Sequence, residues 1–353
     1  MTDALSDFDG LLEWGALQEW IQAQPGIPGS GPVTEVTQLT GGSQNNIFLM
    51  SRNGAKSVLR RPPKHLRKNS NGTMLREATV LGAIKGSDVP HPELYATGDD
   101  ESVIGVNFYV MEPINGFTPM GQLPGRYATD AEWRRKLAFE MVDAAAELGA
   151  IDYGAVGLSE FGKAENWLER QVSRWRSQLD GYSQIEGYGK PDIPGVDEIG
   201  DWLEQHKPAE AKIGIIHGDY QFANVMFSYD EPRLAAAVDW ELSSLGDPLL
   251  DLAWVLQSWI EPGDPAGRAP GLQPWEDMPS RAELVARYGE VSGRDMSDVP
   301  WFEVLGCYKL GILLEGTYAR SLAGQAPKEL GEIMHSITLW LFAKARQVIQ
   351  QQG

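Results

Sequence analysis

The hydrophobic pattern of the chain changes once, at a connector rich in Pro and Gly over residues 113–128. Before the connector, apolar residues alternate with polar ones as in half-buried strands, at 33–39, 46–50, 57–60 and 105–112. Helical spacing of apolar residues marks 11–24 and 73–84 in the same part of the chain. This order of elements predicts a small antiparallel β lobe with one helix inserted between its strands.

Helical patterns dominate after the connector. The segments expected there are, in order, helices at 129–151 and 166–179, a surface excursion at 181–200, short strands at 213–217, 223–227 and 234–240, a Pro- and Gly-rich loop at 261–274, and helices to the end. The sequence therefore predicts an α+β fold with two lobes. Its expected parts are an N-terminal helix and β lobe over 1–112, a hinge over 113–128 and a larger, mainly α lobe over 129–353.

Charge disfavours several classes of partner. The chain carries 49 acidic and 30 basic residues, a net charge of -19 at pH 7. So acidic a surface disfavours binding to nucleic acid and to anionic membranes. No uncharged apolar run approaches the roughly 20 residues of a membrane helix, and the acidic start MTDALSDFDG lacks the apolar core of a signal peptide. We therefore expect a cytoplasmic protein, either a monomer or a homodimer.

The single cysteine, Cys307, lies in the apolar stretch WFEVLGCYKLGILL. One cysteine can form no internal disulfide, which fits a reducing compartment. Its apolar neighbours predict a buried thiol without chemical function.

A basic window stands out against the acidic background. Residues 51–85 contain nine cations and one carboxylate, Glu77, a local charge of +8. Such a window is either a solvated basic face or a place where a polyanion docks.

Polar side chains follow the short strands predicted in the second lobe, in IIHGDYQFANVMF and AAAVDWE. Asp219 follows one apolar strand, Asn224 lies five residues later, and Asp239 ends a further strand. We expect these strands to lie side by side in one small sheet, which brings the three side chains together. Phosphoryl transfer uses such a set, a carboxylate that accepts the proton of the attacking hydroxyl and oxygen ligands for Mg²⁺. The spacing from Asp219 to Asn224 equals that of Asp and Asn in the protein-kinase catalytic loop.

These motifs resemble those of the aminoglycoside phosphotransferase and choline kinase-like family, which shares the protein-kinase fold. HGDYQFAN is similar to its H-G-D-x-x-x-x-N loop, and VDWELSSLGDPLLDLAW to its D-x-E…G-D-P…D-L-A segment. LERQVSRW and FEVLGCYKLGILLEGTYAR resemble the branch of kinase-like domains joined to acyl-CoA dehydrogenases. The resemblance covers nearly the whole chain. It implies a phosphotransferase that uses ATP and Mg²⁺ and acts on a hydroxyl of a small molecule.

The resemblance also implies roles for residues at the motif positions. Asp219 would be the catalytic base, and Asn224 and Asp239 would ligate Mg²⁺. His217 would brace the loop. Glu241 would either help at a second metal or only order the loop.

Two further acidic residues, Asp247 and Asp251, are expected to cap and brace the catalytic loop, because an Asp on an apolar helix must be paired. The chain departs from the family at Leu148-Gly149, where Leu-His is usual. That histidine mainly packs and positions, so we expect activity to survive its absence.

The small lobe is expected to hold the nucleotide. The turn at 40–45 would offer backbone N–H groups and the Ser43 hydroxyl to a phosphate. Arg60 is the candidate for the cation that contacts the α- and β-phosphates, with Arg61 as the alternative. Glu77 would pair with Arg60 and hold it in place.

The hinge would contact the adenine through backbone atoms. The Glu112 carbonyl and the Ile114 N–H are the expected partners. Because these are main-chain groups, the sequence does not distinguish ATP from GTP.

Two classes of function remain open. One is a small-molecule kinase, and the other is a non-catalytic nucleotide-binding protein with a decayed site. The second is disfavoured because the base, both metal ligands and a phosphate cation are present. Protein kinase activity lacks support, since Asp239 leads into Trp-Glu rather than Phe-Gly.

Two classes of acceptor also remain open. Carboxylates at 197–210 and Glu261 and Asp264 would attract a cationic aminoglycoside. The resemblance to the acyl-CoA dehydrogenase-linked branch favours instead a hydroxyacyl thioester or another metabolite, whose anionic tail the stretch Lys64–Lys68 would hold. We favour a metabolic hydroxyl over an antibiotic.

Overall fold

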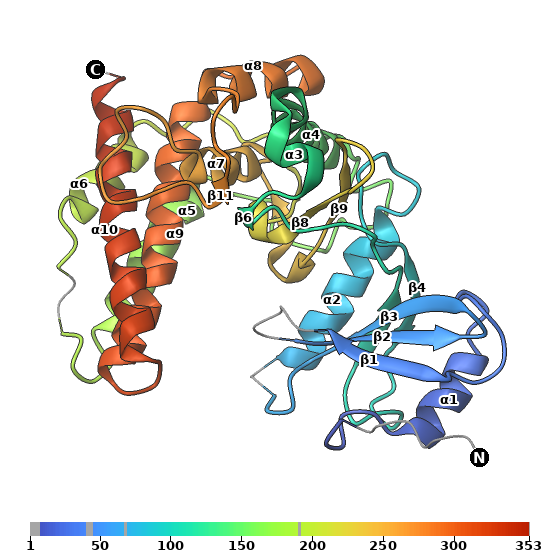
Figure 1. Ribbon diagram of the computed structural model, residues 1–353. Helices are drawn as coiled ribbons and strands as arrows, with labels where there is room; N and C mark the ends of the chain where they lie inside the picture. Colours follow the sequence, from blue (N-terminus) through green and yellow to red (C-terminus); the bar gives the residue numbers. More distant parts are fainter. Residues whose placement is uncertain (1–7, 40–44, 67–68, 190–191, 353) are drawn as a thin grey trace.

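The structure, a computed structural model, describes residues 8–39, 45–66, 69–189 and 192–352. It has a smaller lobe built on a β-sheet, from the first third of the chain, and a larger lobe that is mainly helical (Figure 1). This order agrees with the pattern predicted from the sequence, and the fold is α+β.

Within the described residues, the sheet of the small lobe has five strands in the order β1-β2-β3-β5-β4, and every neighbouring pair is antiparallel. The strands are β1 (Glu35–Leu39), β2 (Asn46–Arg52), β3 (Ala55–Arg61), β4 (Leu94–Gly98) and β5 (Phe108–Met111). Asn53 and Gly54 between β2 and β3 both have positive φ, the geometry of a two-residue hairpin turn. The sequence pattern did not single out β4, whose first four residues are all partly exposed.

Two helices cover opposite faces of this sheet. Leu17 and Ile21 of α1 (Trp14–Gln22) join a core with Leu59 of β3. On the other face, α2 (Ser70–Ala83) packs Leu81 in the same core as Tyr109 of β5. Because successive strand residues point to opposite faces, β3 directs Leu59 toward α1 and its neighbours 58 and 60 toward α2.

The large lobe contains most of the helices. They are α3 (Gly125–Thr129), α4 (Ala131–Ala150), α5 (Glu169–Tyr182), α6 (Val196–Gln205), α7 (Leu249–Ser258), α8 (Arg281–Ser292), α9 (Val299–Leu322) and α10 (Lys328–Gln350). The helix predicted over 129–151 is present as α4, whereas α3, which lies mostly in the predicted hinge, was not expected. Asp130, whose backbone is extended, ends α3. Its carboxylate then caps α4 by accepting a hydrogen bond from the Glu132 N–H at 3.0 Å. The surface excursion predicted over 181–200 was wrong at its end, where α6 begins at Val196.

The short strands of the large lobe form separate pairs. β7 (Gly214–Ile216) pairs with β10 (Ser244–Gly246), and β8 (Val225–Phe227) pairs with β9 (Leu234–Ala237). The expectation of one sheet for the strands that carry the motif was therefore wrong. The reason is that β10 occupies the edge of β7. β10 has only three residues and no apolar pattern, so the sequence did not indicate it. A further pair, β6 (Gly121–Gln122) with β11 (Leu272–Gln273), is parallel.

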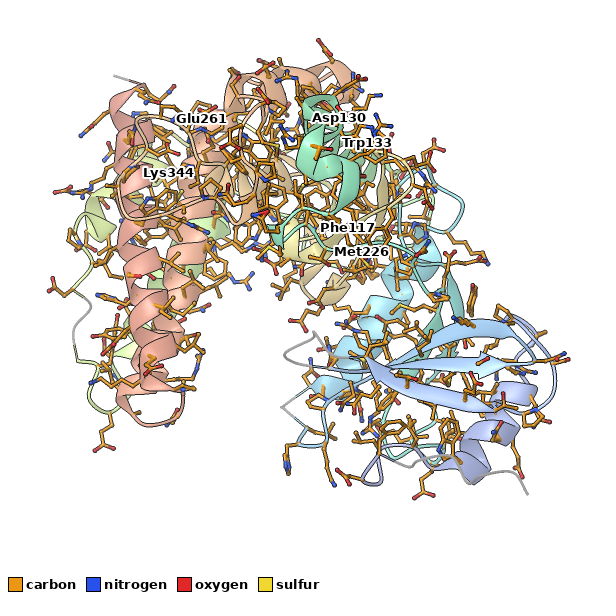
Figure 2. The ribbon with its side chains drawn as sticks, in the orientation of Figure 1. Phe117, Asp130, Trp133, Met226, Glu261 and Lys344 are labelled. Atoms are coloured by element: carbon orange, nitrogen blue, oxygen red, sulfur yellow. The ribbon has the colours of Figure 1, made fainter. Side chains whose placement is uncertain are left out.

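Helix α7 is held at its C-terminal end by a lysine from α10. Lys344 points into the large lobe (Figure 2). Its Nζ donates hydrogen bonds to the carbonyls of Leu256, Gln257 and Trp259 at 3.0, 3.1 and 3.1 Å. Carbonyls at a helix end have no intrahelical donor, and a cation there also interacts favourably with the helix dipole. Lys344 thus ties α10 to the end of α7.

Two expectations from the composition remain, one about Cys307 and one about membrane helices. Cys307 is buried, as predicted, and burial raises the pKa of its thiol to about 12. None of the helices in the described part of the chain is long and apolar enough to cross a membrane.

Gly149, the residue at which the chain departs from the family that it resembles, lies against Pro248. A Cβ at position 149 would stand 2.4 Å from the Pro248 Cβ, far closer than two carbons approach. A glycine here lets α4 approach the start of α7.

We predict that Gly149→Ala lowers the free energy of unfolding by about 1–3 kcal/mol, because a rigid proline ring must move. Gly181→Ala is the matched control, since it too is the penultimate residue of a helix and has no atom within 4 Å of the added Cβ. It should leave stability unchanged or raise it by up to about 1 kcal/mol. Urea unfolding of both variants measures the difference, and equal effects would contradict this account of Gly149.

Candidate functional site

The loop that follows β7 is shaped by a glycine. Gly218 has a φ of +83°, and a Cβ there would stand 2.3 Å from the Leu242 carbonyl oxygen. Only glycine takes this conformation without strain and leaves room for that carbonyl. The chain can therefore turn sharply between His217 and Asp219.

A buried carboxylate from α7 holds the same turn. Asp251 accepts hydrogen bonds from the backbone N–H groups of His217 and Gly218, at 2.6 and 2.9 Å. Burial raises the pKa of Asp251, and these two bonds and His217 oppose that rise. The His217 ring is within 2.9 Å of the Val238 carbonyl through Nε2. Asp251 and His217 thus have the contacts that bracing of the loop requires.

The second bracing candidate, Asp247, stands at the start of α7. It forms a bidentate ion pair with Arg294, at 2.7 and 3.1 Å, and accepts the Leu249 N–H at 3.0 Å. Paired and bonded in this way, a buried carboxylate can remain charged.

Asp219 is oriented by three side-chain donors. Its Oδ1 accepts from Trp254 Nε1 and from Gln221 Nε2, both at 2.8 Å, and its Oδ2 accepts from Asn224 Nδ2 at 2.7 Å. A carboxylate has about four lone-pair positions, so these bonds leave room for one more donor. The geometry suits a group that must accept a proton from an incoming hydroxyl.

Asn224 and Asp239 stand on adjacent chain segments. The Val238 N–H donates to the Asn224 carbonyl at 2.9 Å, directly before Asp239. Asp239 has a φ of +67°, an uncommon conformation for a residue with a side chain. The turn leaves its side chain 38% exposed, toward the small lobe.

Arg60 of β3 meets Asp239 across the cleft between the lobes. Its Nη2 lies 2.5 Å from Asp239 Oδ1, and its Nε lies 3.0 Å from Glu77 Oε2. The Tyr109 hydroxyl also donates to Glu77 Oε2, at 2.8 Å. Burial raises the pKa of Glu77 to about 7, although Arg60 and Tyr109 oppose that rise. The predicted pairing of Arg60 with Glu77 is present in the structure.

Arg61 points to the other face of the sheet. Its guanidinium donates to the backbone carbonyls of Leu11 and Pro62. Of the two arginines that the sequence left open, the structure therefore brings Arg60 to the cleft and not Arg61.

A group of carboxylates at this point could hold a cation. Oxygen atoms of Glu77, Asp239 and Glu241 lie within 4.8 Å of one another. Glu77 is fully buried, yet its Oε1 has no hydrogen-bond partner among the described residues. Since Mg²⁺ prefers oxygen ligands, this donor set and the adjacent Asn224 fit a divalent cation. The sequence had given Glu77 only the role of an ion-pair partner.

A mainly apolar cavity of about 370 Å³ lies between the lobes. Its walls include Val58 and Leu81 from the small lobe and Met226 from the large one, and Figure 2 labels Met226 at this junction. The hinge residues Met111 to Ile114, Glu112 among them, form one side, and Arg60 and Asp239 also line it. Ser43, the predicted phosphate contact, lies outside the described residues.

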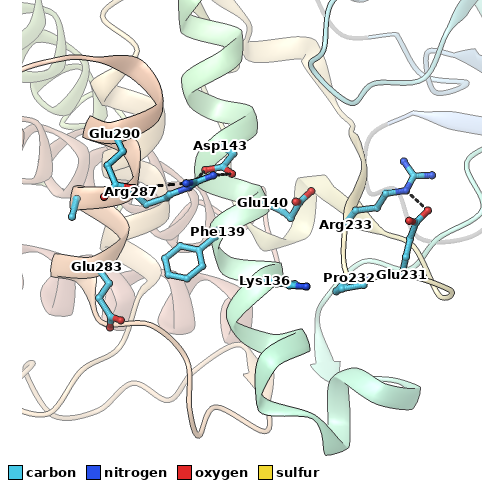
Figure 3. A pocket seen from close by; sticks show the side chains of 11 residues that line it. Lys136, Phe139, Glu140, Asp143, Glu231, Pro232, Arg233, Glu283, Arg287 and Glu290 are labelled. Carbon is cyan, nitrogen blue, oxygen red and sulfur yellow. Dashed lines mark hydrogen bonds and ion pairs between the residues drawn. The ribbon is translucent and has the colours of Figure 1, made fainter.

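A second, larger hollow of about 630 Å³ lies between α4, α8 and the turn after β8 (Figure 3). Several of the charged side chains that line it form ion pairs with one another. Asp143 binds Arg287 in a bidentate ion pair, at 2.7 and 2.6 Å, and Arg233 binds Glu231 at 2.5 Å. It contains none of the predicted site residues, so the cavity between the lobes is the stronger candidate despite its smaller volume.

Trp254 and Gln221 were missed by sequence reasoning. Gln221 lies inside the motif, at a position that the family pattern leaves undefined. Trp254 stands three residues after Asp251, hence on the same face of α7. That spacing was the one feature of the sequence that could have indicated that Trp254 lies near the catalytic loop.

The chain matches known proteins along most of its length. The model of the phosphotransferase enzyme family matches residues 35–284. Acyl-CoA dehydrogenase family member 11 of Gallus gallus is 30% identical over 335 residues, which cover 90% of this chain and 41% of that protein. The chain therefore spans less than half the length of this relative.

Solved structures share the architecture. A Ralstonia eutropha protein, provisionally described as an aminoglycoside phosphotransferase, is 31% identical, with a TM-score of 0.79 over 94% of this chain and 98% of that one. An ADP-bound aminoglycoside phosphotransferase is 14% identical, with a TM-score of 0.57 over 90% of this chain and 95% of that one. These likenesses confirm the predicted protein-kinase-like fold with two lobes.

We predict that Asp251→Asn lowers the free energy of unfolding by about 2–4 kcal/mol, because an amide cannot accept both buried N–H bonds and places an N–H₂ against one donor. Asp152→Asn is the control. Asp152 also accepts two backbone N–H bonds, at 2.9 and 3.1 Å, but both go to Oδ1, which an asparagine retains, and the residue is exposed. Its replacement should therefore cost less than about 1 kcal/mol. Thermal and urea unfolding compare the two, and a smaller loss for Asp251→Asn would refute the bracing role.

Proposed function

Because the chain belongs to the phosphotransferase enzyme family, we propose that it transfers the γ-phosphoryl group of ATP, with Mg²⁺, directly to a hydroxyl group of a small molecule. The observation that carries this proposal is the cavity between the lobes, with the hinge on one side and the Arg60–Asp239 pair lining it as well. An apolar pocket with a few convergent polar groups is the usual form of a nucleotide site.

The nucleotide would lie along this cavity. Apolar walls suit an adenine base, whose edge would bond to the Glu112 carbonyl and the Ile114 N–H. Arg60 would then bind the α- and β-phosphates through its planar guanidinium. A structural neighbour of the same fold is bound to ADP, which supports a nucleotide as the ligand.

Asn224 and Asp239 would hold the metal, together with Glu77 and Glu241 beside Asp239. Mg²⁺ in such a site neutralises the charge that develops on the phosphates. Glu77 would keep Arg60 in position from the other side.

Asp219 is the proposed base. The acceptor hydroxyl would donate its proton to the lone-pair position that Trp254, Gln221 and Asn224 leave open. The acceptor oxygen forms a bond to the γ-phosphorus, the bond from that phosphorus to the bridging oxygen breaks, and ADP leaves. Because transfer is direct, no phosphorylated enzyme is formed.

We predict that Asp219→Asn lowers kcat about 10²–10⁴-fold, since an amide cannot take the proton, while the Kd for Mg·ATP changes little. A coupled assay for ADP with a panel of alcohols measures the first, and calorimetry measures the second. Asp230→Asn, the same change at an exposed position after β8, is the control. Unchanged turnover of Asp219→Asn on a confirmed acceptor would rule out Asp219 as the base.

We predict that Arg60→Lys weakens Mg·ATP binding about tenfold, because an ammonium cannot bind phosphate oxygens in the bidentate manner of a guanidinium. Arg61→Lys, the same substitution one residue along on the opposite face of β3, should leave the Kd for Mg·ATP near the wild-type value. Calorimetry on the two variants makes the comparison. The assignment of Arg60 fails if the two Kd values shift alike.

A further inference from the structure

Lys309, at the middle of α9, lies beside the turn that presents Asp219. Its Nζ donates to the Gly218 carbonyl at 3.3 Å, and the residue is half-buried. Gly218 directly precedes Asp219. The large lobe therefore places a positive charge next to the proposed base. This charge is additional to that of Arg60, which comes from the small lobe.

Two indole rings adjoin this ammonium group. Nζ is 4.3 Å from the centroid of the Trp254 ring and 5.8 Å from that of the Trp175 ring. Trp254 is also the residue whose Nε1 donates to Asp219, at 2.8 Å. One indole thus contacts Lys309 through its face and Asp219 through its N–H, which fixes the two charged groups relative to each other.

Lys309 differs from the structural lysine of the same lobe. The ammonium of Lys344 has three donors, and backbone carbonyls accept from all of them within 3.1 Å. Lys309 has the same three donors, but within the described chain the Gly218 carbonyl is its one hydrogen-bond acceptor. No described carboxylate forms an ion pair with it. The other two N–H groups have no hydrogen-bond acceptor among the described residues, and the side chain is only partly buried.

The charge of Lys309 is maintained at a cost. Burial lowers the pKa of its ammonium to about 8, while Asp251 and Asp219 oppose that shift. Desolvation of a cation without an ion pair costs free energy, which the faces of the two indole rings offset only in part. Packing alone would be served as well by an apolar side chain of similar length.

Two of the acidic residues that favoured a cationic acceptor, Glu261 and Asp264, are already neutralised. Arg281 binds Glu261 at 3.0 Å and Asp264 at 2.8 Å, and Lys344 lies 3.7 Å from Asp264. These carboxylates stabilise the loop before α8 and are not free to attract an aminoglycoside.

We propose that Lys309 is an acceptor-binding residue, whose ammonium group receives a carboxylate or acyl carbonyl oxygen of the acceptor while the acceptor hydroxyl reaches Asp219. This inference rests on the phosphotransferase function proposed above and adds the class of acceptor. Lys309 selects hydroxy acids and their acyl derivatives and repels amines.

The test compares acceptors that differ in one group. Straight-chain hydroxy acids of several lengths, their methyl esters, the corresponding diols and the corresponding amino alcohols are assayed with Mg·ATP, for kcat and KM separately. Binding of the same compounds with Mg·ADP is followed by tryptophan fluorescence, which reports selectivity without turnover. The esters distinguish recognition of a carbonyl oxygen from recognition of a full negative charge.

Three variants accompany the wild type. Lys309→Met removes the charge and keeps the length of the side chain, and Lys309→Arg keeps the charge. Lys328→Met removes one lysine charge from an exposed position at the start of α10 and is the matched control. Thermal unfolding shows whether each variant is folded. The selectivity of the wild type tests the proposed acceptor class even if a variant does not fold.

We expect the wild type to favour an acid or ester over the matched amino alcohol by about tenfold or more, as one charge-assisted hydrogen bond provides. Lys309→Met should abolish this preference mainly through the KM for the acid, whereas Lys309→Arg and Lys328→Met should retain it. Equal use of acids and amines by the wild type, binding of no acid or ester, or an unchanged preference in Lys309→Met would overturn the inference. Phosphorylation of amino alcohols or diols would then leave the proposed function intact, whereas lack of Mg²⁺-dependent transfer to every acceptor would count against that function itself.

Discussion

One buried guanidinium joins the two lobes at the point where chemistry is proposed. Arg60 contacts Glu77 within the small lobe and Asp239 in the large lobe, which lies 179 residues further along the chain than Arg60. Strand alternation places Arg60 on this face, and the left-handed backbone of Asp239 turns its carboxylate toward the arginine. A charge buried in this way must be compensated, so the position of the small lobe and the shape of the turn at Asp239 constrain each other.

Behind this junction, the large lobe presents a rigid frame. Asp251 bonds the turn at Gly218 from the first half of α7, and Trp254 bonds Asp219 from the next turn of the same helix. Preorganised hydrogen bonds of this kind orient a reacting group without reorganisation during the reaction. One helix thereby fixes both the backbone that carries the proposed base and the direction of its carboxylate.

The sequence predicted those parts of the site that depend on local order. The alternation of β3 and the carboxylate on the helix after it indicated the pair of Arg60 with Glu77, whereas Asp239 was assigned through the resemblance to the kinase-like family. Contacts made by distant segments escaped it. Lys309 reaches Gly218 from α9, which lies about ninety residues further along the chain, and its apolar surroundings in the sequence do not show which segment its ammonium group contacts. The pairing of β7 with β10 was missed for a similar reason, because three residues are too few to show a period.

The two ends of α7 contact different parts of the large lobe. Its first half belongs to the turn at Asp219, whereas its last carbonyls are bound by Lys344 beside the loop that precedes α8. Substitutions in that loop can accumulate on one side of the helix while the reacting groups on the other side keep their geometry.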